Sequence, residues 1–279
     1  MTEFRADLHT HTTSSDGSLT PSELVAAAVQ ANLSGLSITD HDTVDSYQEA
    51  IPAAAKLGLE LLSGVEFTAR DGRESVHILG YGFELEDASL RAFCARHVIR
   101  REERNRQILE KLTQLGLPVS EQELLAKFSF EGKKVYGRPH IAEVMVEKGY
   151  VTSLQEAFHE WIGEGKRAYA PGEDVSLQVT IDVIHNAGGR AVIAHPHLLK
   201  FPKTVRHIQT LPFDGIEAYY SRFTPASESR WVRLAKEKGW ITTGGSDFHG
   251  AAKPRILLGC SWVNEEIFRL LQSGRKAAP

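Results

Sequence analysis

The chain has 279 residues, of which 42% are apolar and 24% charged, and its formal net charge at pH 7 is −4. This length and composition are typical of one large globular domain with a small insertion. The negative charge argues against bulk electrostatic binding to duplex nucleic acid or to an anionic membrane, although it leaves room for a local basic site. Cys94 and Cys260 form no paired motif, which favours reduced structural thiols over a disulfide or a zinc–thiolate site. Because no stretch has the length of a membrane span or the pattern of a signal peptide, we expect a cytoplasmic protein.

Apolar runs of strand length alternate with helical segments along most of the chain. The predicted strands are Phe4–Leu8, Gly35–Thr39, Leu59–Gly64, Val76–Gly82, Arg190–Ala194, Gly215–Tyr219 and Ile241–Gly244. A helix is predicted to begin at Pro21, after the N-cap candidate Thr20. Further helices are predicted over Val44–Leu57, Leu177–Ala187, Pro225–Lys238 and Glu265–Gln272. This alternation predicts an α/β fold with a parallel sheet, either open or closed into a barrel.

The alternation is interrupted between about residues 90 and 165. Leu90–Leu115 is predicted to form one long amphipathic helix, which carries Arg96, Arg100, Arg101, Arg104 and Arg106. Further helices are predicted over Glu121–Phe128, Pro139–Lys148 and Leu154–Ile162, with no convincing strand. We therefore expect an all-helical insertion at 90–165 within a domain formed by 1–89 and 166–279.

Potential metal ligands lie at or just after the ends of several predicted strands, namely His9, His41, Glu66, His195 and Asp247. The carboxyl ends of parallel strands share one face of a sheet or barrel, so these side chains can converge. Imidazole and carboxylate groups together can hold catalytic divalent metals without cysteine. A single such residue is usually a satisfied polar group, but this clustering is hard to obtain by chance. His77 is the exception, because it lies inside its apolar run and requires that strand to bend or end early.

Local spacing adds further candidates. His9 and His11 are two residues apart, as are Asp247 and His249, so each pair points to one face of an extended chain. Asp16 lies in a loop rich in Ser, Thr and Gly that can fold back toward these residues. Glu66 has two oxygens with which to bridge metals. Asp40 either binds metal or fixes the tautomer of a histidine.

These segments resemble the PHP family, the polymerase and histidinol phosphatase superfamily of metal-dependent phosphoesterases. The resemblance rests on Asp7-Leu8-His9-Thr10-His11 with Ser15-Asp16-Gly17, Thr39-Asp40-His41, Gly64-Val65-Glu66, Ala194-His195-Pro196 and Gly245-Ser246-Asp247-Phe248-His249. It implies a distorted (β/α)7 barrel with two or three divalent metals. By motif position, one metal would bind His9, His11, Glu66 and Asp247, a second Asp16, His41 and His249, and a third Glu66, His77 and His195.

The chemistry implied is hydrolysis by a metal-activated water. Metals lower the pKa of a bound water from ~15.7 toward ~7. We expect Asp16, His41, Glu66 and Asp247 to hold the resulting hydroxide, and His197 is a candidate general acid. Asp16 stands where other branches of the superfamily carry a histidine. This carboxylate favours Mn²⁺, with Fe²⁺ and Zn²⁺ as alternatives.

The helical insertion suggests the substrate. The chain is most similar to the branch that hydrolyses nucleoside 3′,5′-bisphosphates, with related members that trim short RNA from the 5′ end. The resemblance implies that Arg101, Arg104, Arg138 and His140 hold the remote phosphate or nucleotide, with Arg100 as the alternative to Arg101. Arg138 also precedes a predicted helix N-terminus, which suits an anion. An arginine-rich helix paired with Glu102 and Glu103 on a solvated face explains the same pattern equally well.

We therefore expect a phosphatase that removes the 3′-phosphate of nucleoside 3′,5′-bisphosphates, such as 3′-phosphoadenosine 5′-phosphate, and that also trims short RNA. The expected partner is a small nucleotide or short oligonucleotide, without duplex nucleic acid or membrane. One alternative is a phosphatase for histidinol phosphate or another small phosphomonoester. An alternative of a different class is a metal-binding domain without catalytic activity.

Overall fold

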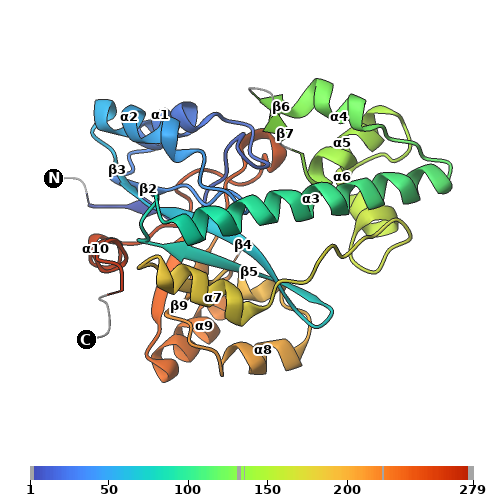
Figure 1. The fold of residues 1–279 in the computed structure, drawn as a ribbon. Coiled ribbons are helices and arrows are strands. Elements are labelled where there is room, and N and C mark those ends of the chain that lie inside the picture. Colours follow the sequence, from blue (N-terminus) through green and yellow to red (C-terminus); the bar gives the residue numbers. More distant parts are fainter. Residues whose placement is uncertain (1–2, 131–132, 135, 222, 276–279) are drawn as a thin grey trace. The chain divides into compact units, whose positions relative to one another are not determined.

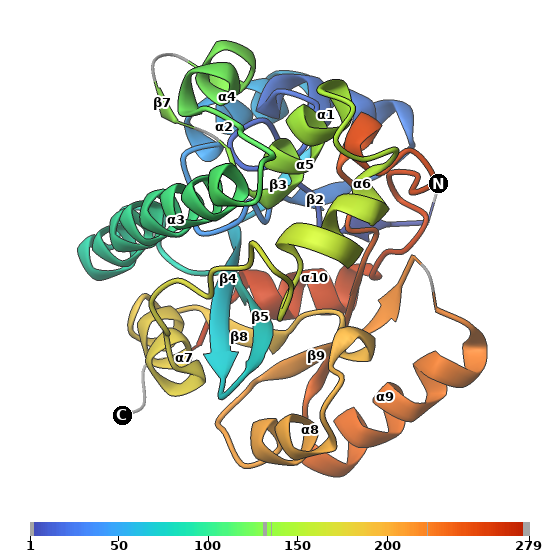
Figure 2. The ribbon, with the colours of Figure 1, turned by 90° about the vertical axis from the view of Figure 1, so that its right-hand side faces the viewer.

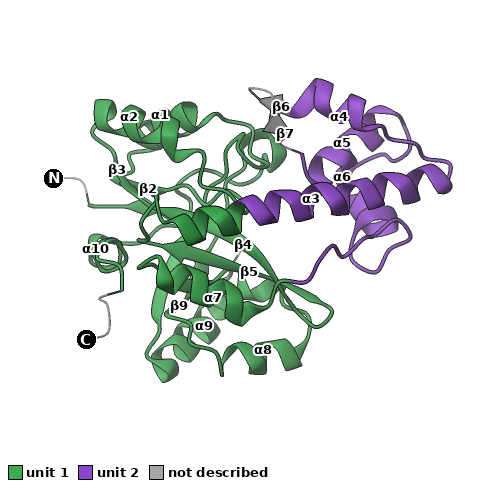
Figure 3. Ribbon diagram, viewed as in Figure 1, with its two compact units in different colours: residues 1–94, 175–279 green, residues 95–174 purple. Residues whose placement is uncertain are grey.

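The computed structural model in Figure 1 describes residues 3–130, 133–134, 136–221 and 223–275. The chain divides into two compact units, which Figure 3 colours separately. Unit 1 comprises residues 1–94 and 175–279, and unit 2 comprises residues 95–174. Both limits of unit 2 lie further along the chain than those of the predicted insertion, and the helix α3 (Ala88–Gln114) runs from unit 1 into unit 2.

Unit 1 contains two sheets. One is parallel with the order β1-β2-β3, and the other has the order β10-β9-β8-β5-β4. The strands are β1 (Ala6–Asp7), β2 (Gly35–Ser37), β3 (Glu60–Leu62), β4 (Gly64–Asp71), β5 (Glu74–Tyr81), β8 (Arg190–Ile193), β9 (Gly215–Tyr220) and β10 (Ile241–Gly245). The predicted α/β class is confirmed. The prediction of uniformly parallel strands is wrong, because β5 is antiparallel to both β4 and β8. The described strands form no closed sheet.

Isolated bridges link the two sheets. A parallel bridge between Thr10 and Phe248 joins the segments that follow β1 and β10, and another joins His41 to Glu66. Asp247 N donates to His9 O at 2.8 Å, which strengthens the first junction. The segments that follow β1 and β10 therefore meet each other, and the segment that follows β2 meets the first half of β4.

The β4–β5 hairpin was not predicted. It turns at Gly72, whose φ of 60° lies in the left-handed region that favours glycine. Val65 and Phe67 enter the core, so Glu66 and Thr68 point to the opposite face of β4. Thr68 pairs with His77, which places His77 on that same face. His77 therefore reaches the side of Glu66 from the middle of β5, without an early end to its strand.

Helices cover the outer faces of unit 1, as Figures 1 and 2 show. Helices α1 and α2 pack together beside the three-stranded sheet, whereas α7 and α9 pack on the five-stranded sheet. Residues of both sheets and of α10 form a further apolar cluster, which includes Leu8, Tyr81, Val192 and Phe268. The helices are α1 (Pro21–Gln30), α2 (Tyr47–Leu57), α7 (Leu177–Asn186), α8 (Pro202–Ile208), α9 (Pro225–Lys238) and α10 (Glu265–Gln272). Of these, α8 was not predicted.

Unit 2 is mainly helical and has its own apolar core, which includes Ile108, Leu112, Leu124, Ile141 and Met145. Its elements after α3 are α4 (Glu121–Phe128), β6 (Ser129–Phe130), β7 (Lys133–Lys134), α5 (Arg138–Glu147), α6 (Leu154–Glu156) and a π-helix (Ala157–Ile162). The antiparallel pair β6–β7 shows that the prediction of a unit without strands is wrong. Among the described residues of the whole chain, no helix has the length and hydropathy needed to cross a membrane.

Candidate metal centre

The structure places every predicted ligand in one largely buried group within unit 1. The group consists of overlapping clusters in which the ligand atoms lie within 4.8 Å of one another. The clusters are His11, Asp16, His41 and His249; His9, His11 and Asp247; His9, Glu66 and His195; and His41, Glu66 and His77. Loop, strand-end and mid-strand residues therefore meet at one place.

Glu66 lies at the middle of this group and is 1% exposed. Its Oε1 lies 2.8 Å from His77 Nδ1 and 2.9 Å from His195 Nε2. The distances from its Oε2 are 3.1 Å to His41 Nδ1, 3.3 Å to His11 Nε2 and 3.4 Å to His9 Nε2. The two carboxylate oxygens thus face different sets of histidines.

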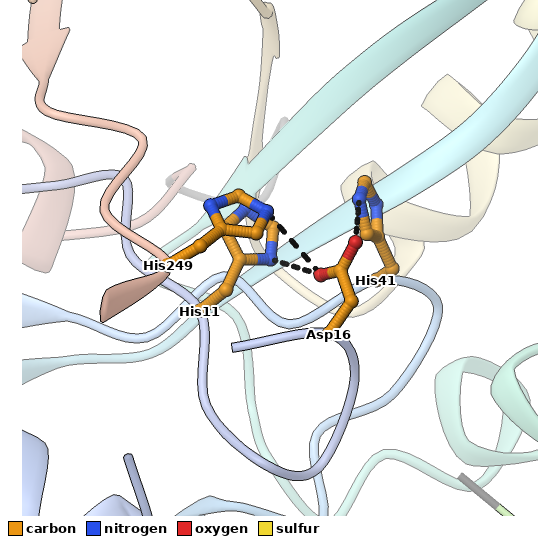
Figure 4. A group of neighbouring side chains, drawn as sticks. All are labelled: His11, Asp16, His41 and His249. Atoms are coloured by element: carbon orange, nitrogen blue, oxygen red, sulfur yellow. Dashed lines mark ion pairs between the residues drawn. The ribbon is translucent and has the colours of Figure 1, made fainter. Parts of the chain in front are cut away.

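Asp16 lies among three histidines, shown in Figure 4. Its Oδ1 is 3.3 Å from His249 Nε2 and 3.6 Å from His11 Nδ1, and its Oδ2 is 3.7 Å from His41 Nε2. The loop can approach this closely because Gly17 has no side chain: a Cβ there would lie 2.3 Å from His11 O. A residue with a side chain at position 17 would therefore push the loop, and Asp16 with it, away from His11.

Asp40 shapes the same loop. Its carboxylate accepts hydrogen bonds from Thr12 N at 2.8 Å, Thr12 Oγ1 at 2.6 Å and Ser15 Oγ at 2.5 Å. Neither role predicted for Asp40 matches these contacts, since they are made to the loop and not to a histidine. The short hydroxyl side chains of the loop direct Asp40 to this structural role.

Asp247 presents its two oxygens to different groups and has a left-handed φ of 59°. Oδ1 lies 3.4 Å from His11 Nε2 and 3.5 Å from His9 Nε2. Oδ2 accepts hydrogen bonds from Tyr220 Oη and Lys253 Nζ, both at 2.7 Å. These two donors leave Oδ1 to face the histidines. The sequence analysis identified neither of these two donors. Tyr220 directly follows a predicted strand, which was the available signal, whereas no motif marks Lys253.

Glu217 was also missed. It is fully buried in β9, and its Oε1 lies 2.9 Å from His9 Nδ1. Its Oε2 accepts a hydrogen bond from His195 N at 2.7 Å. An acidic residue inside the apolar run Gly215–Tyr219 was the available signal, because such a residue must find buried donors.

Comparison with known proteins identifies the family. The model of the PHP domain matches residues 7–169. The chain belongs to the PHP family. The 5′-3′ exoribonuclease Rnm of Salmonella typhimurium is 34% identical over 92% of this chain and 86% of its own length. The 3′,5′-nucleoside bisphosphate phosphatase of Chromobacterium violaceum is 32% identical over 87% of this chain and 86% of its own length.

Solved structures agree with the assignment of this chain to the PHP family. A Bifidobacterium adolescentis protein described as a metal-dependent phosphoesterase superposes with a TM-score of 0.87 at 31% identity, covering 98% of this chain and 97% of that one. A Chromobacterium violaceum protein described as an amidohydrolase, with bound sulfate and no metal, gives a TM-score of 0.85 at 30% identity and covers 96% of both chains. The chain is therefore a metal-dependent phosphoesterase, and the predicted recognition and enzyme class are confirmed.

The residues of the PHP centre fit divalent metals. His9 Nε2 and His11 Nε2 are buried and make no hydrogen bond among the described residues. Both nevertheless point toward carboxylate oxygens of Glu66 and Asp247, at 3.3 to 3.5 Å. Buried nitrogen atoms without a hydrogen bond, directed at carboxylate oxygens, form a donor set that suits a divalent cation.

Charge balance in the metal-free PHP centre supports the same conclusion. Burial opposes ionisation of Asp16 and Glu66, but nearby histidines hold the pKa of each carboxyl well below its usual range. Burial likewise opposes protonation of His11, but Asp247 and Glu66 raise the pKa of that ring to about 9. Protonation of His11 therefore balances part of the buried negative charge, and a bound metal would displace that proton.

The other predicted site residues of the PHP chain lie outside these clusters. The His197 ring packs against Tyr220 and Phe223, with centroids 4.7 Å and 4.4 Å away. The residues predicted to bind substrate all belong to unit 2. The His140 ring packs on Phe128, with the centroids 4.3 Å apart, and its Nδ1 accepts a hydrogen bond from Gly137 N.

The arginines of α3 differ in their partners within unit 2. Arg100 Nε donates to Glu173 Oε2 at 2.7 Å. By contrast, Arg101 lies next to the start of α5, since a Cβ added at Gly137 would be 3.5 Å from Arg101 Nη1. A Cβ added at Gly172 would lie 3.4 Å from Arg104 Cβ. Of the two alternatives, Arg101 is therefore the one beside Gly137 and its neighbour Arg138.

We expect Gly245→Ala to destabilise the PHP fold by about 1–3 kcal/mol, the usual cost of overpacking. An added Cβ would lie 2.4 Å from His9 Cβ and 2.5 Å from His9 N, so β1 and β10 would have to separate. Chemical denaturation of the metal-free protein measures this change. Gly137→Ala is the matched control, because its Cβ would meet Arg101 and Pro139 only at 3.5 and 3.7 Å. Equal stability of the two variants would contradict the close approach.

Proposed function

We propose that this chain removes the 3′-phosphate of nucleoside 3′,5′-bisphosphates, such as 3′-phosphoadenosine 5′-phosphate, and trims short RNA from the 5′ end. The observation that carries the proposal is the set of clusters around Glu66, which offers ligands for more than one metal. Similarity over most of the chain to an exoribonuclease and to a bisphosphate phosphatase supports this choice of substrate.

The metal ligands in this proposal are His9, His11, Asp16, His41, Glu66, His77, His195, Asp247 and His249. Bound there, two or three divalent metals would supply an activated water and neutralise the phosphate oxygens. Asp16, His41, Glu66 and Asp247 hold the attacking water in place. Asp16 contributes an oxygen where a histidine would contribute nitrogen, which favours Mn²⁺ over Zn²⁺.

We further propose that unit 2 anchors the second phosphate through Arg101, Arg104, Arg138 and His140. Guanidinium groups suit this task because their planar fork binds phosphate in a bidentate manner. The closeness of Arg101 to Gly137, at the start of α5, supports a shared role with Arg138. For unit 1, the bridges between its sheets support a distorted (β/α)7 barrel.

The substrate proposal predicts that a second phosphate increases kcat/KM. We expect 3′-phosphoadenosine 5′-phosphate to exceed adenosine 3′-monophosphate by at least about tenfold, because a hydrogen bond to a charged group contributes ~1.5–3 kcal/mol. Phosphate release assays on both nucleotides and on histidinol phosphate measure the preference. Equal rates on the two nucleotides would contradict an anchor for the second phosphate. A preference for histidinol phosphate would favour the alternative phosphatase.

The same assay tests the anchor itself. Arg101→Ala should remove most of the preference for the bisphosphate while leaving hydrolysis of the monophosphate largely unchanged. Arg106→Ala is the matched control on the same helix, because Arg106 is largely exposed and pairs with Glu103 and Glu110. An equal loss in both variants would point to damage to the helix and not to a lost phosphate contact.

A further inference from the structure

Glu217 connects two proposed ligands that come from different parts of unit 1. It is fully buried, and its two carboxylate oxygens have different partners. Oε1 lies 2.9 Å from His9 Nδ1, and Oε2 accepts the backbone N–H of His195 at 2.7 Å. His9 follows β1 and His195 follows β8. One side chain of β9 therefore contacts both.

The contact with His9 determines which ring nitrogen is available to a metal. A carboxylate beside Nδ1 favours the proton on that nitrogen and leaves the lone pair on Nε2. In the structure His9 Nε2 faces Glu66 Oε2 at 3.4 Å and Asp247 Oδ1 at 3.5 Å. The nitrogen that Glu217 leaves unprotonated is thus the one directed into the proposed centre.

The contact with His195 acts through the backbone. His195 has φ 24° and ψ 62°, a conformation that residues other than glycine rarely adopt and that needs support from its surroundings. The hydrogen bond from its N–H to Glu217 supplies such support. In this conformation His195 Nε2 lies 2.9 Å from Glu66 Oε1.

We propose that Glu217 is a positioning residue that prepares His9 and His195 for metal binding at the same time. The inference rests on the proposed metal centre. His9 and His195 were assigned by motif to different metals, so loss of Glu217 weakens two metal sites through one change.

Glu217→Gln tests this role because glutamine has the same shape but only one acceptor. Two N–H donors face residue 217, and the backbone donor of His195 cannot change. If the amide oxygen accepts from His195, the amide NH2 faces His9 Nδ1 and shifts the ring proton to Nε2. If the amide oxygen instead accepts from His9, the NH2 group faces the His195 N–H, and these two donors cannot form a hydrogen bond. Either orientation removes one ligand from its binding geometry.

The experiment measures metal binding, not turnover, on the full chain. Titration calorimetry with Mn²⁺ and elemental analysis give the affinity and the stoichiometry. We expect Glu217→Gln to lose about 10- to 100-fold in affinity, the usual effect of removing a group that orients a metal ligand. Glu74→Gln is the matched control: Glu74 is also buried, but it accepts hydrogen bonds from the backbone of Lys200 and Phe201.

The outcomes separate the two levels of the proposal. Unchanged metal affinity in Glu217→Gln, with only a lower melting temperature, would overturn the positioning role and leave the proposed function intact. A wild-type chain that binds no divalent metal would overturn both. If Glu217→Gln does not fold, Glu217→Asp takes its place, because its shorter side chain keeps the charge but reaches only one partner. Its affinity should then also fall by about 10- to 100-fold, and no loss would overturn the proposal.

Nitrogen NMR of the histidine rings provides a direct second readout. In the wild-type chain loaded with diamagnetic Zn²⁺, we expect the proton of His9 on Nδ1. In Glu217→Gln, the same spectrum should show the proton on Nε2 or a ring without bound metal. An unaltered His9 tautomer, combined with weaker metal binding, would overturn the proposed route through His9.

Discussion

Replacing Glu66 with glutamine is expected to lower turnover by more than about 100-fold while the protein remains folded. Loss of a residue that merely orients a metal ligand costs ~10–100-fold, so loss of Glu66, a proposed ligand itself, should cost more. Folding should survive because glutamine keeps the shape of Glu66, and because His9 and His11, whose pKa values Glu66 helps to raise, can release their protons once the negative charge is gone. Phosphate release and far-UV circular dichroism measure the two effects.

Glu74→Gln provides the matched control for this prediction. Glu74 begins β5, is 3% exposed and contacts backbone N–H groups instead of histidines. We expect its turnover to stay within about twofold of the wild type, because the described hydrogen bonds of Glu74 go to the backbone of Lys200 and Phe201 and to no proposed metal ligand. Comparable turnover in Glu66→Gln and Glu74→Gln would contradict the proposed role of Glu66 as a metal ligand.

Metal affinity is expected to rise with pH, by up to about tenfold per pH unit for each proton displaced. In the metal-free protein, attraction by Asp247 and Glu66 outweighs burial and raises the pKa of His11 to about 9, so this ring is protonated at pH 7. A metal must displace that proton, which becomes easier as the pH approaches 9. Calorimetric titration with Mn²⁺ at pH 6, 7 and 8 measures the slope.

The same pKa gives an independent check on stability. His11 stabilises the metal-free fold fully below its unfolded pKa of ~6.5, and this contribution is lost as pH rises through the folded pKa. The protein treated with a chelator should therefore become less stable as the pH rises from about 6.5 to 9, whereas the metal-loaded protein should keep its stability over this range. We also expect the chelator-treated protein to be inactive. An affinity for Mn²⁺ that does not change with pH would contradict the protonated state of His11.

The sequence predicted the parts of the fold that depend on local pattern. Helices α4, α9 and α10 have the predicted limits, because caps and hydrophobic period are local signals. The β4–β5 hairpin was missed although Asp71-Gly72 is a recognised turn signal between alternating residues. Glu66 looked like a strand end because a short apolar run precedes it, yet it is an early residue of β4. Antiparallel pairing, a non-local property, then decides where His77 lies.

At the candidate site, too, local sequence pattern indicated the ligands but not the residues that contact them from other elements. Its predicted ligands carry imidazole or carboxylate groups in recognisable spacings, so their types and positions were informative. Glu217, Tyr220 and Lys253 act on those ligands from other elements, and only tertiary contact reveals which ligand each one touches. Asp40 shows the converse. Its motif suggested that it binds metal, but its carboxylate accepts hydrogen bonds from the hydroxyl groups of Thr12 and Ser15.

The junction between β1 and β10 determines when the centre can be completed during synthesis. Ser246 N donates to the Asp7 carboxylate across 239 positions of sequence, and Asp247 N donates to His9 O. At ~5–20 residues per second, His9 leaves the ribosome roughly 10–50 s before Asp247 does. Such distant pairings form late in folding. During that interval His9 and His11 lack Asp247 as a neighbour, so the proposed set of ligands is complete only after residue 249 has been translated.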